Sequence, residues 1–225
     1  MEQVFFINPV AGKRDASAEL VPQIQAAARQ LQLPQPQIVV TQYAGQAREA
    51  AHRYAASGTP AALYACGGDG TLNELVQGAA GSANVAVGCV PCGSGNDYVR
   101  NFGAAGQAPF LDFAAQLQAQ PCRVDLLQTS LGIGIDICAA GLDAQVAYGI
   151  PKFRRLPGCG GTAAYTLSIL QAMLSRFGHK LRVAIDGKEY TGTYMMAAIC
   201  NGGYYGGGYQ ARSEEHTSEL QSLRH

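Results

Sequence analysis

The first half of the chain alternates short apolar segments with segments of helical periodicity, and this alternation is the strongest constraint on its fold. A helix that joins two successive strands returns the chain in the same direction, so the pattern predicts a doubly wound, mostly parallel α/β sheet with helices on both faces. We expect strands at 4–7, 38–41, 61–66 and 85–90, and helices at 17–31, 46–57 and 71–80.

The second half has a different pattern from about Pro121 onward. Extended segments dominate there, and Asp186-Gly187 has the form of a two-residue hairpin turn. We therefore predict an α/β domain over residues 1–120 and a β-rich domain over residues 121–211. The elements expected in the second domain are strands at 123–127, 132–139, 181–185 and 190–200, and one helix at 162–177.

The last residues, 212–225, differ abruptly in composition from the Gly- and Tyr-rich segment before them. The run from Arg212 to Ser222 resembles the translation of a common sequencing-library adapter. We interpret 212–225 as a non-native tail and leave it out of the fold prediction, which implies a natural protein that continues past Ala211. A genuine polar helix is the alternative.

Composition argues against several classes of protein. Sixteen basic and sixteen acidic residues give a formal net charge of zero, without the basic surplus typical of a nucleic-acid partner. The N-terminus lacks the pattern of a signal peptide, and no apolar run reaches the ~18 residues of a membrane span. The seven cysteines are irregularly spaced and odd in number, which disfavours a disulfide scaffold. We expect a cytoplasmic protein that can visit a membrane surface.

Cys89 and Cys92 have CxxC spacing, which can indicate a redox or zinc site. No second pair or histidine stands near them in the sequence, and the glycine-rich run that follows suits a phosphate loop better. The segment Lys152–Leu156 mixes basic and apolar residues beside two prolines. It predicts a loop that is either solvated or in contact with anionic lipid.

A glycine-rich loop, Gly67–Glu74, lies between the third predicted strand and the third predicted helix. Its glycines let backbone amides approach a ligand, and a helix N-terminus favours phosphate. Asp69 can hold Mg²⁺, and Thr71 can cap the helix or touch phosphate. The loop matches neither the Walker A nor the GxGxxG pattern. A tight strand-to-helix turn capped by Thr71 is the structural alternative.

A second loop, Gly93–Tyr98, follows the fourth predicted strand. Like the first loop, it combines glycines with polar side chains, here a hydroxyl, an amide and a carboxylate. The carboxyl ends of parallel strands meet at one edge of a sheet, so both loops should face a shared crevice. A capped turn is again the alternative. The segment Asn8–Gly12, after the first strand, is a weaker third candidate.

Together these motifs resemble the diacylglycerol kinase catalytic-domain family, which includes bacterial lipid kinases and sphingosine kinases and is related to NAD kinases and phosphofructokinases. The resemblance covers residues 4–211. It implies an N-terminal domain of the NAD kinase and phosphofructokinase type, followed by a β-rich domain that would be incomplete here. It also rests on Gly141–Ala144 with Val146, and on Asn201 with Gly206–Gly208.

By position, the resemblance implies ATP and Mg²⁺ as cofactors and γ-phosphoryl transfer to a lipid hydroxyl such as that of diacylglycerol, a reaction of phospholipid biosynthesis. The lipid would be met at the inner membrane surface, and a homodimer is left open. The resemblance links a bound Mg²⁺ to a further Asp-Gly stretch late in the second domain, which this sequence lacks, so Asp69 is a Mg²⁺ candidate from the glycine loop alone. Asn96, Asp97 and Asp125 are the candidates at the interdomain cleft. The implied ATP contacts are Asn8, Pro9, Gly12, Thr41, Gly67, Gly68, Asp69, Gly70, Thr71, Leu72, Asn73, Glu74 and Ser94, the last more often threonine in the family.

The resemblance also implies a general base in an Asp-Gly-Glu segment late in the second domain, and this sequence has no such segment. The run Asp186–Glu189 resembles it only superficially, because it lies in an early hairpin. We therefore expect this chain to bind nucleotide weakly and not to turn over. Two alternatives stay open: a soluble-substrate kinase of the NAD kinase type, and a nucleotide-binding remnant without catalysis.

Overall fold

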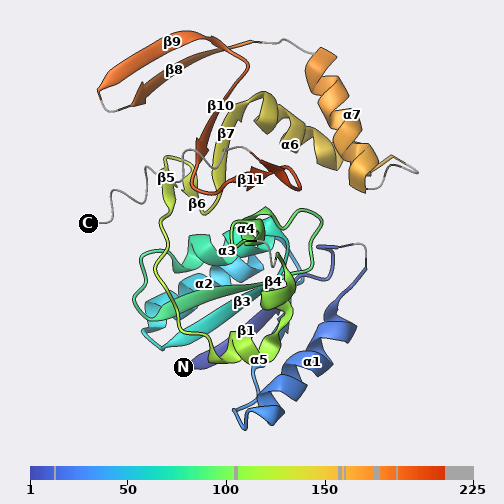
Figure 1. Cartoon of the computed structure of the whole chain (residues 1–225), viewed down its shortest axis with the longest axis vertical. Coiled ribbons are helices and arrows are strands. Elements are labelled where there is room, and N and C mark those ends of the chain that lie inside the picture. Colours follow the sequence, from blue (N-terminus) through green and yellow to red (C-terminus); the bar gives the residue numbers. More distant parts are fainter. Residues whose placement is uncertain are drawn as a thin grey trace. The chain divides into compact units, whose positions relative to one another are not determined.

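The computed structural model describes residues 1–210, apart from 13, 104–105, 157–158, 160, 175–177 and 186, so the tail predicted at 212–225 lies outside the described residues. The chain forms two compact units (Figure 1). Among the described residues, the first unit is Met1–Ile137 together with Cys200–Gln210, and the second unit is Cys138–Ile199. Contacts thus group residues after Cys200 with the first unit, whereas the sequence assigned them to the second domain.

A four-stranded sheet forms the centre of the first unit, with the strand order β2-β1-β3-β4. All three pairings are parallel, because each strand is followed by a helical crossover. The predicted parallel sheet is confirmed, with strand boundaries that differ by at most two residues. The strands are β1 (Glu2–Ile7), β2 (Gln37–Val40), β3 (Ala61–Gly67) and β4 (Val85–Pro91).

Helices cover both faces of this sheet (Figure 1). Successive residues of β1 point to opposite faces, so Val4 and Phe6 pack with α2 and α3, while Phe5 and Ile7 pack with α1 and α5. The doubly wound prediction is confirmed. The helices of the first unit are α1 (Ser17–Gln30), α2 (Gln46–Ser57), α3 (Asp69–Ala79), α4 (Asp97–Arg100) and α5 (Phe113–Gln118), with a 3₁₀ turn at Ala108–Leu111.

The CxxC pair lies within this core. Cys89 packs on the α2 and α3 face and Cys92 on the α1 and α5 face, so the sheet separates the two side chains. Burial raises the pKa of Cys89 to about 12 and that of Cys92 to about 11, which keeps both thiols protonated and unreactive at neutral pH.

The predicted strand at 123–127 is wrong for most of its length, because only β5 (Leu127–Thr129) is regular there. It pairs antiparallel with β6 (Gly132–Gly134), and the predicted strand at 132–139 breaks at Asp136 before β7 (Ile137–Gly141). Two short strands, β11 (Tyr204–Tyr205) and β12 (Tyr209–Gln210), form a small antiparallel ribbon later in the first unit.

The described residues of the second unit form two two-stranded sheets and two helices. Figure 1 labels these elements. In one sheet β7 pairs with β10 (Met196–Cys200), and in the other β8 (His179–Ile185) pairs antiparallel with β9 (Lys188–Tyr194), as the hairpin signal predicted. The helices are α6 (Leu142–Arg154) and α7 (Gly161–Leu174).

Helix α6 corrects two predictions, because we expected one helix in this region and a loop at Lys152–Leu156. Pro151 lies inside α6, where it removes one backbone hydrogen bond. Helix α7 packs against α6 in the turns before Pro151: the Ser168 hydroxyl donates to the Val146 carbonyl oxygen at 2.6 Å, and Gly149 leaves room for the Ser168 side chain. None of the described helices is both long and apolar enough to cross a membrane.

Candidate functional site

The two predicted glycine loops lie side by side at the carboxyl edge of the sheet. The carbonyl oxygen of Gly67, the last residue of β3, accepts the N–H groups of Cys92 at 3.0 Å and Gly93 at 3.1 Å. A Cβ added to Gly93 would collide with the backbone of Gly68. Glycine is therefore required for the backbones of the two loops to touch.

The loop after β1 joins this arrangement. A Cβ on Gly12 would lie 2.6 Å from the carbonyl oxygen of Cys92, so this glycine also permits backbone contact. The Asn8 side chain donates from Nδ2 to Thr71 Oγ1 at 3.1 Å, and its Oδ1 accepts the Val10 N–H at 3.1 Å. The structure thus brings all three sequence-predicted loops together.

Helix α3 begins in the first glycine loop and has no side-chain cap. Its N-cap is Gly68 in an extended conformation, and Thr71 is buried with its hydroxyl bonded to Asn8. The alternative in which Thr71 caps the helix is therefore wrong. The Thr71 and Leu72 N–H groups donate to the Gly68 carbonyl oxygen at 3.0 and 3.1 Å, so the first-turn amides left for a ligand are those of Asp69 and Gly70, and a Cβ on Gly70 would meet no atom within 4 Å. Open space thus lies beside amides that can donate to a ligand.

The other predicted ATP contacts lie in several environments. Leu72 is buried in the hydrophobic core on the inner face of α3, so it anchors the helix and does not line the loops. Glu74 accepts the Gly45 N–H at 2.9 Å and holds the start of α2. The Thr41 N–H donates to the Ile7 carbonyl oxygen at 2.8 Å at the same sheet edge. Pro9 and Asn73 are half-buried and Ser94 is exposed.

Asn96 shapes the second glycine loop from inside. Its Oδ1 accepts the Gly93 N–H at 3.1 Å and its Nδ2 donates to the Gly93 carbonyl oxygen at 3.0 Å. Its backbone has a φ of +55°, a left-handed conformation that asparagine tolerates better than most residues. The amide of Asn96 is therefore used within the loop and not presented to a cleft.

Asp97, the first residue of α4, is buried and tied to a distant part of the chain. Its Oδ2 accepts the Gly207 N–H at 2.8 Å. Its Oδ1 lies 3.5 Å from Arg100 Nε, and neither of these two atoms has a hydrogen-bond partner among the described residues. Burial raises the pKa of Asp97 and the nearby Asp69 charge raises it further, while the Gly207 N–H and Arg100 act in the opposite direction.

Asp69 links the two glycine loops through its carboxylate. Its Oδ1 accepts the Tyr98 N–H at 3.2 Å, and a Cβ on Gly95 would lie 2.9 Å from its Oδ2. Asp125 is not part of this group: its side chain is exposed, and its carbonyl oxygen accepts Asn201 Nδ2 at 2.8 Å.

Sequence reasoning missed a third carboxylate at this edge, Asp136. Burial raises its pKa to about 6, and the charges of Asp69 and Asp97 also raise it, while a hydrogen bond from Asn101 lowers it. Asp69, Asp97 and Asp136 therefore share one negative field. A lone carboxylate inside the apolar run 132–139 was the sequence signal that could have revealed it. Within the described ranges, no three metal-binding side chains are grouped closely enough to enclose a metal ion.

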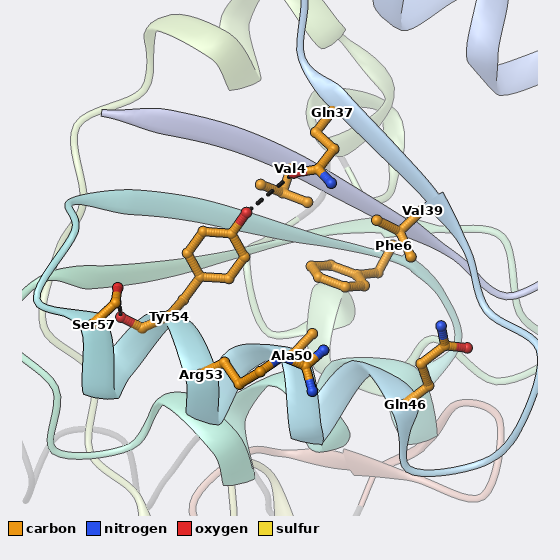
Figure 2. A pocket seen from close by; sticks show the side chains of 9 residues that line it. All are labelled: Val4, Phe6, Gln37, Val39, Gln46, Ala50, Arg53, Tyr54 and Ser57. Atoms are coloured by element: carbon orange, nitrogen blue, oxygen red, sulfur yellow. Dashed lines mark hydrogen bonds between the residues drawn. The ribbon is translucent and has the colours of Figure 1, made fainter.

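A surface hollow lies elsewhere in the first unit, between α2 and the β1–β2 edge, and Figure 2 shows the side chains that surround it. The Tyr54 hydroxyl donates to Gln37 Oε1 at 3.1 Å on one side of this hollow. None of the predicted site residues is part of its lining, which is Val4, Phe6, Gln37, Val39, Gln46, Ala50, Arg53, Tyr54 and Ser57.

The model of a known protein family matches most of the first unit. Residues 2–129 match the model of the diacylglycerol kinase catalytic domain. The chain belongs to the diacylglycerol kinase catalytic-domain family. Residues 136–214 also match the YegS C-terminal NAD kinase beta sandwich-like domain.

Relatives within the diacylglycerol kinase catalytic-domain family are moderately similar. The chain is 30% identical over 173 residues to "Probable lipid kinase YegS-like" of Chromohalobacter salexigens, covering 73% of this chain and 54% of that protein. It is 28% identical over 138 residues to "Diacylglycerol kinase" of Bacillus subtilis, covering 61% of this chain and 45% of that protein. The chain thus spans about half the length of the curated relatives it matches.

Solved structures show the same fold for members of this family. The crystal structure of a diacylglycerol kinase from Bacillus anthracis str. Sterne superposes with a TM-score of 0.64 at 23% identity, covering 92% of this chain and 66% of that one. The predicted fold class, a doubly wound, mostly parallel α/β sheet followed by a β-rich part, is confirmed, and the later strands form small antiparallel sheets.

Proposed function

We propose that this chain carries the nucleotide-binding part of an ATP-dependent lipid kinase, which transfers the γ-phosphoryl group to a lipid hydroxyl such as that of diacylglycerol. The observation that supports it most is the contact between the glycine loops at the uncapped start of α3. Membership of the diacylglycerol kinase catalytic-domain family supports the choice of reaction.

Backbone amides at the start of α3 suit the phosphates of ATP. The N–H groups of Asp69 and Gly70 belong to the first turn, where the helix dipole adds a partial positive charge. No side chain caps this turn, and a Cβ on Gly70 would meet no atom within 4 Å, so a phosphate oxygen can approach. These residues bind and orient; they supply no chemistry of their own.

A cation fits the charge at this edge, because three carboxylates would otherwise repel phosphate. Mg²⁺ in nucleotide sites is held by one or two carboxylates together with phosphate oxygens and water, and does not need an all-protein cage. Asp69 is the carboxylate nearest the open amides and the residue we propose to hold it. When bound, Mg²⁺ would offset the charge that builds on the transferred group.

The acceptor hydroxyl must lose a proton as its oxygen bonds to phosphorus and the bond from phosphorus to the leaving oxygen breaks. The Asp-Gly-Glu segment implied to take this proton is absent from the sequence. We therefore expect nucleotide binding without turnover from this chain alone, and transfer to lipid from a longer protein that supplies that segment.

The test uses two aspartates that each accept a backbone N–H. Asp69→Asn keeps the Oδ1 that accepts the Tyr98 N–H, and the matched control Asp112→Asn keeps the Oδ1 that accepts the Ala115 N–H in α5. Calorimetric titration with ATP is run with and without Mg²⁺. We expect Asp69→Asn to weaken binding about tenfold with Mg²⁺ and to leave it equal or tighter without Mg²⁺, because a negative charge is removed.

The control should bind like the wild type in both conditions. Equal affinities for Asp69→Asn and wild type in the presence of Mg²⁺ would reject Asp69 as the magnesium-binding carboxylate. No ATP binding by the folded wild-type chain would reject the proposed function. Transfer of labelled phosphate by the full-length protein to diacylglycerol in mixed micelles supports the lipid reading, whereas transfer to NAD alone favours the soluble-substrate alternative.

A further inference from the structure

The chain returns to the first unit at Cys200, and the stretch Cys200–Gly208, called the return segment below, is held by polar contacts. The Asn201 N–H donates to the Asp136 carbonyl oxygen at 2.8 Å, and Asn201 Nδ2 donates to the Ile135 carbonyl oxygen at 2.8 Å. Further on, the Gly207 N–H reaches Asp97. The return segment is therefore bonded at both ends to the region around the second glycine loop.

Asn101, the residue that ends α4, bonds to three separate parts of this region. Its Nδ2 donates to the Tyr98 carbonyl oxygen at 3.0 Å and to Asp136 Oδ1 at 3.2 Å. Its Oδ1 accepts the N–H of Gly203 at 2.6 Å. One amide thus connects helix α4, a carboxylate of the acidic edge and the middle of the return segment.

The return segment packs closely against Asp136 and Asn101 at Gly202. A Cβ on Gly202 would collide with the Asp136 carboxylate and would lie 2.7 Å from Asn101 Nδ2. Four residues after Gly203 comes Gly207, whose Cα lies 4.0 Å from the Cβ position of Gly95. Fixing Gly203 therefore fixes how the return segment covers the second glycine loop.

We propose that Asn101 is a positioning residue, whose amide holds the return segment against α4 and so keeps the Gly207 N–H on the Asp97 carboxylate. The bearing of this role on nucleotide binding rests on the proposed function, because Asp97 belongs to the loop proposed to meet ATP. Both polar atoms of the Asn101 side-chain amide are needed. Its Oδ1 accepts the Gly203 N–H, and its Nδ2 donates to Asp136 Oδ1.

The charges around Asp136 provide a test of the hydrogen bond that Asn101 Nδ2 donates to this carboxylate. Asp69 and Asp97 face it as like charges, Tyr98 stays neutral because its pKa is raised to about 12, and Asn101 is its hydrogen-bond donor. In Asn101→Asp the acceptor for Gly203 remains, but a carboxylate faces Asp136. The new carboxylate also raises the pKa of Asp136 above its wild-type value of about 6, so at pH 5 the pair can share a proton, and as the pH rises the proton is lost and the two charges repel.

The experiment is hydrogen–deuterium exchange of peptides from the return segment, with each variant compared with the wild type at the same pH. Asn101→Ala should speed exchange there about tenfold at every pH, the loss expected for hydrogen bonds of this kind. Asn101→Asp loses the bond to the Tyr98 carbonyl oxygen at every pH, so it should exchange more slowly than Asn101→Ala at pH 5 and approach Asn101→Ala at pH 8. Asn101 is exposed, so these variants should keep the hydrophobic core.

Asn84→Ala is the matched control, because Asn84 Nδ2 also donates to two backbone carbonyl oxygens, those of Tyr54 and Thr59, at 2.9 Å each. It should speed exchange near residues 54–59 and leave the return segment unchanged. Unchanged exchange in Asn101→Ala would overturn the proposal, as would an Asn101→Asp variant whose exchange relative to wild type is the same at pH 5 and pH 8.

Titration with ATP separates this inference from the proposed function. Weaker binding by Asn101→Ala, with Asn84→Ala unchanged, extends the positioning role to the nucleotide site. Equal binding in a variant whose return segment has loosened overturns that extension. If the wild type binds no ATP, the proposed function fails, and the exchange results still decide what Asn101 does.

Discussion

The two compact units of this chain differ in how many large apolar side chains they bury, although both also expose some, such as Leu131 in the first unit. In the first unit, Val4, Phe5, Phe6 and Ile7 are at most 1% exposed. In the second unit, Tyr148 is 87% exposed and Leu174 is 89% exposed. The buried apolar side chains described for the second unit are smaller and few, namely Val146, Ala164 and Ala172.

The difference follows from the sheets. Four parallel strands with helices on both faces enclose two layers of side chains, whereas a two-stranded sheet has too little surface to do so. We infer that the first unit supplies most of the stability of this chain. The glycine loops and the return segment all belong to that unit, so the candidate site is on the stable part.

The comparison predicts its largest effect for one leucine from each unit. Leu63 in β3 is fully buried, and Leu174 in α7 is 89% exposed. Leu63→Ala should lower the free energy of unfolding by about 2–5 kcal/mol, because it leaves a cavity between packed layers. Leu174→Ala should change it by less than about 0.5 kcal/mol. Urea unfolding measures the free energy of unfolding of both variants. Similar losses for the two would contradict the inference that the first unit supplies most of the stability.

A second prediction concerns two glycines at the site. Gly93→Ala should destabilise the first unit by about 1–3 kcal/mol, because its Cβ would collide with the backbone of Gly68. Gly70→Ala should instead stabilise it by up to about 1 kcal/mol, since Gly70 is within α3 and a Cβ there meets no atom within 4 Å. Thermal unfolding measures the change in stability of both variants. Changes of the same sign would mean that the two glycine loops do not pack against one another.

Much of the first unit could be predicted because its signals are local. Strand and helix periods and glycine runs each act over a few residues, and they predicted the sheet and the meeting of the loops. Leu72 could also have been recognised as a core residue, since Leu75 and Val76 share its buried helix face. Helix α6 was missed, because Pro151 indicated its absence and the contact with Ser168 is between residues 22 positions apart.

The rest of the site could not be predicted for a related reason. Asn101 and Asp136 acquire their role from partners far along the chain, such as Gly203 and the charge of Asp69. No sequence signal near Asn101 marks it, and the one signal for Asp136, a lone carboxylate in the apolar run 132–139, says nothing about those partners. The return segment was assigned to the other domain because its Gly- and Tyr-rich composition says nothing about where it binds.

A third, smaller effect concerns pH. The pKa of Asp136 is raised from 3.8 to about 6, so its contribution to stability is complete below pH 3.8 and is lost as pH rises through 6. Asp136→Asn should remove this loss. Because the carboxylate is only half-buried, we expect a gain of about 1 kcal/mol at pH 8, after allowance for solvent screening, and a smaller gain at pH 5.

Urea unfolding at the two pH values measures this effect. A gain of equal size at pH 5 and pH 8 would show that the charge of Asp136 is not its cause. Asp143 in the second unit has a pKa that burial also raises. Asp143→Asn should leave the main unfolding transition unchanged if that transition reports the first unit.

The smallest expected effect is on the surface, where the two units should behave alike. Arg14 pairs with Glu19 at 2.9 Å in the first unit, and Arg182 pairs with Glu189 at 2.6 Å in the second. All four side chains are about half exposed or more, so Arg14→Ala and Arg182→Ala should each leave the unfolding midpoint unchanged within error. A clear loss in Arg182→Ala alone would show that the second unit depends on surface charge.

The contact between Asp97 and Gly207 also bears on how the protein is made. The two residues are 110 positions apart, so a ribosome adding about 5–20 residues per second delivers Gly207 on the order of 5–20 s after Asp97. All four strands of the large sheet precede residue 92 and can assemble in that interval. The nascent chain therefore holds a folded sheet with an uncovered acidic edge until its return segment emerges.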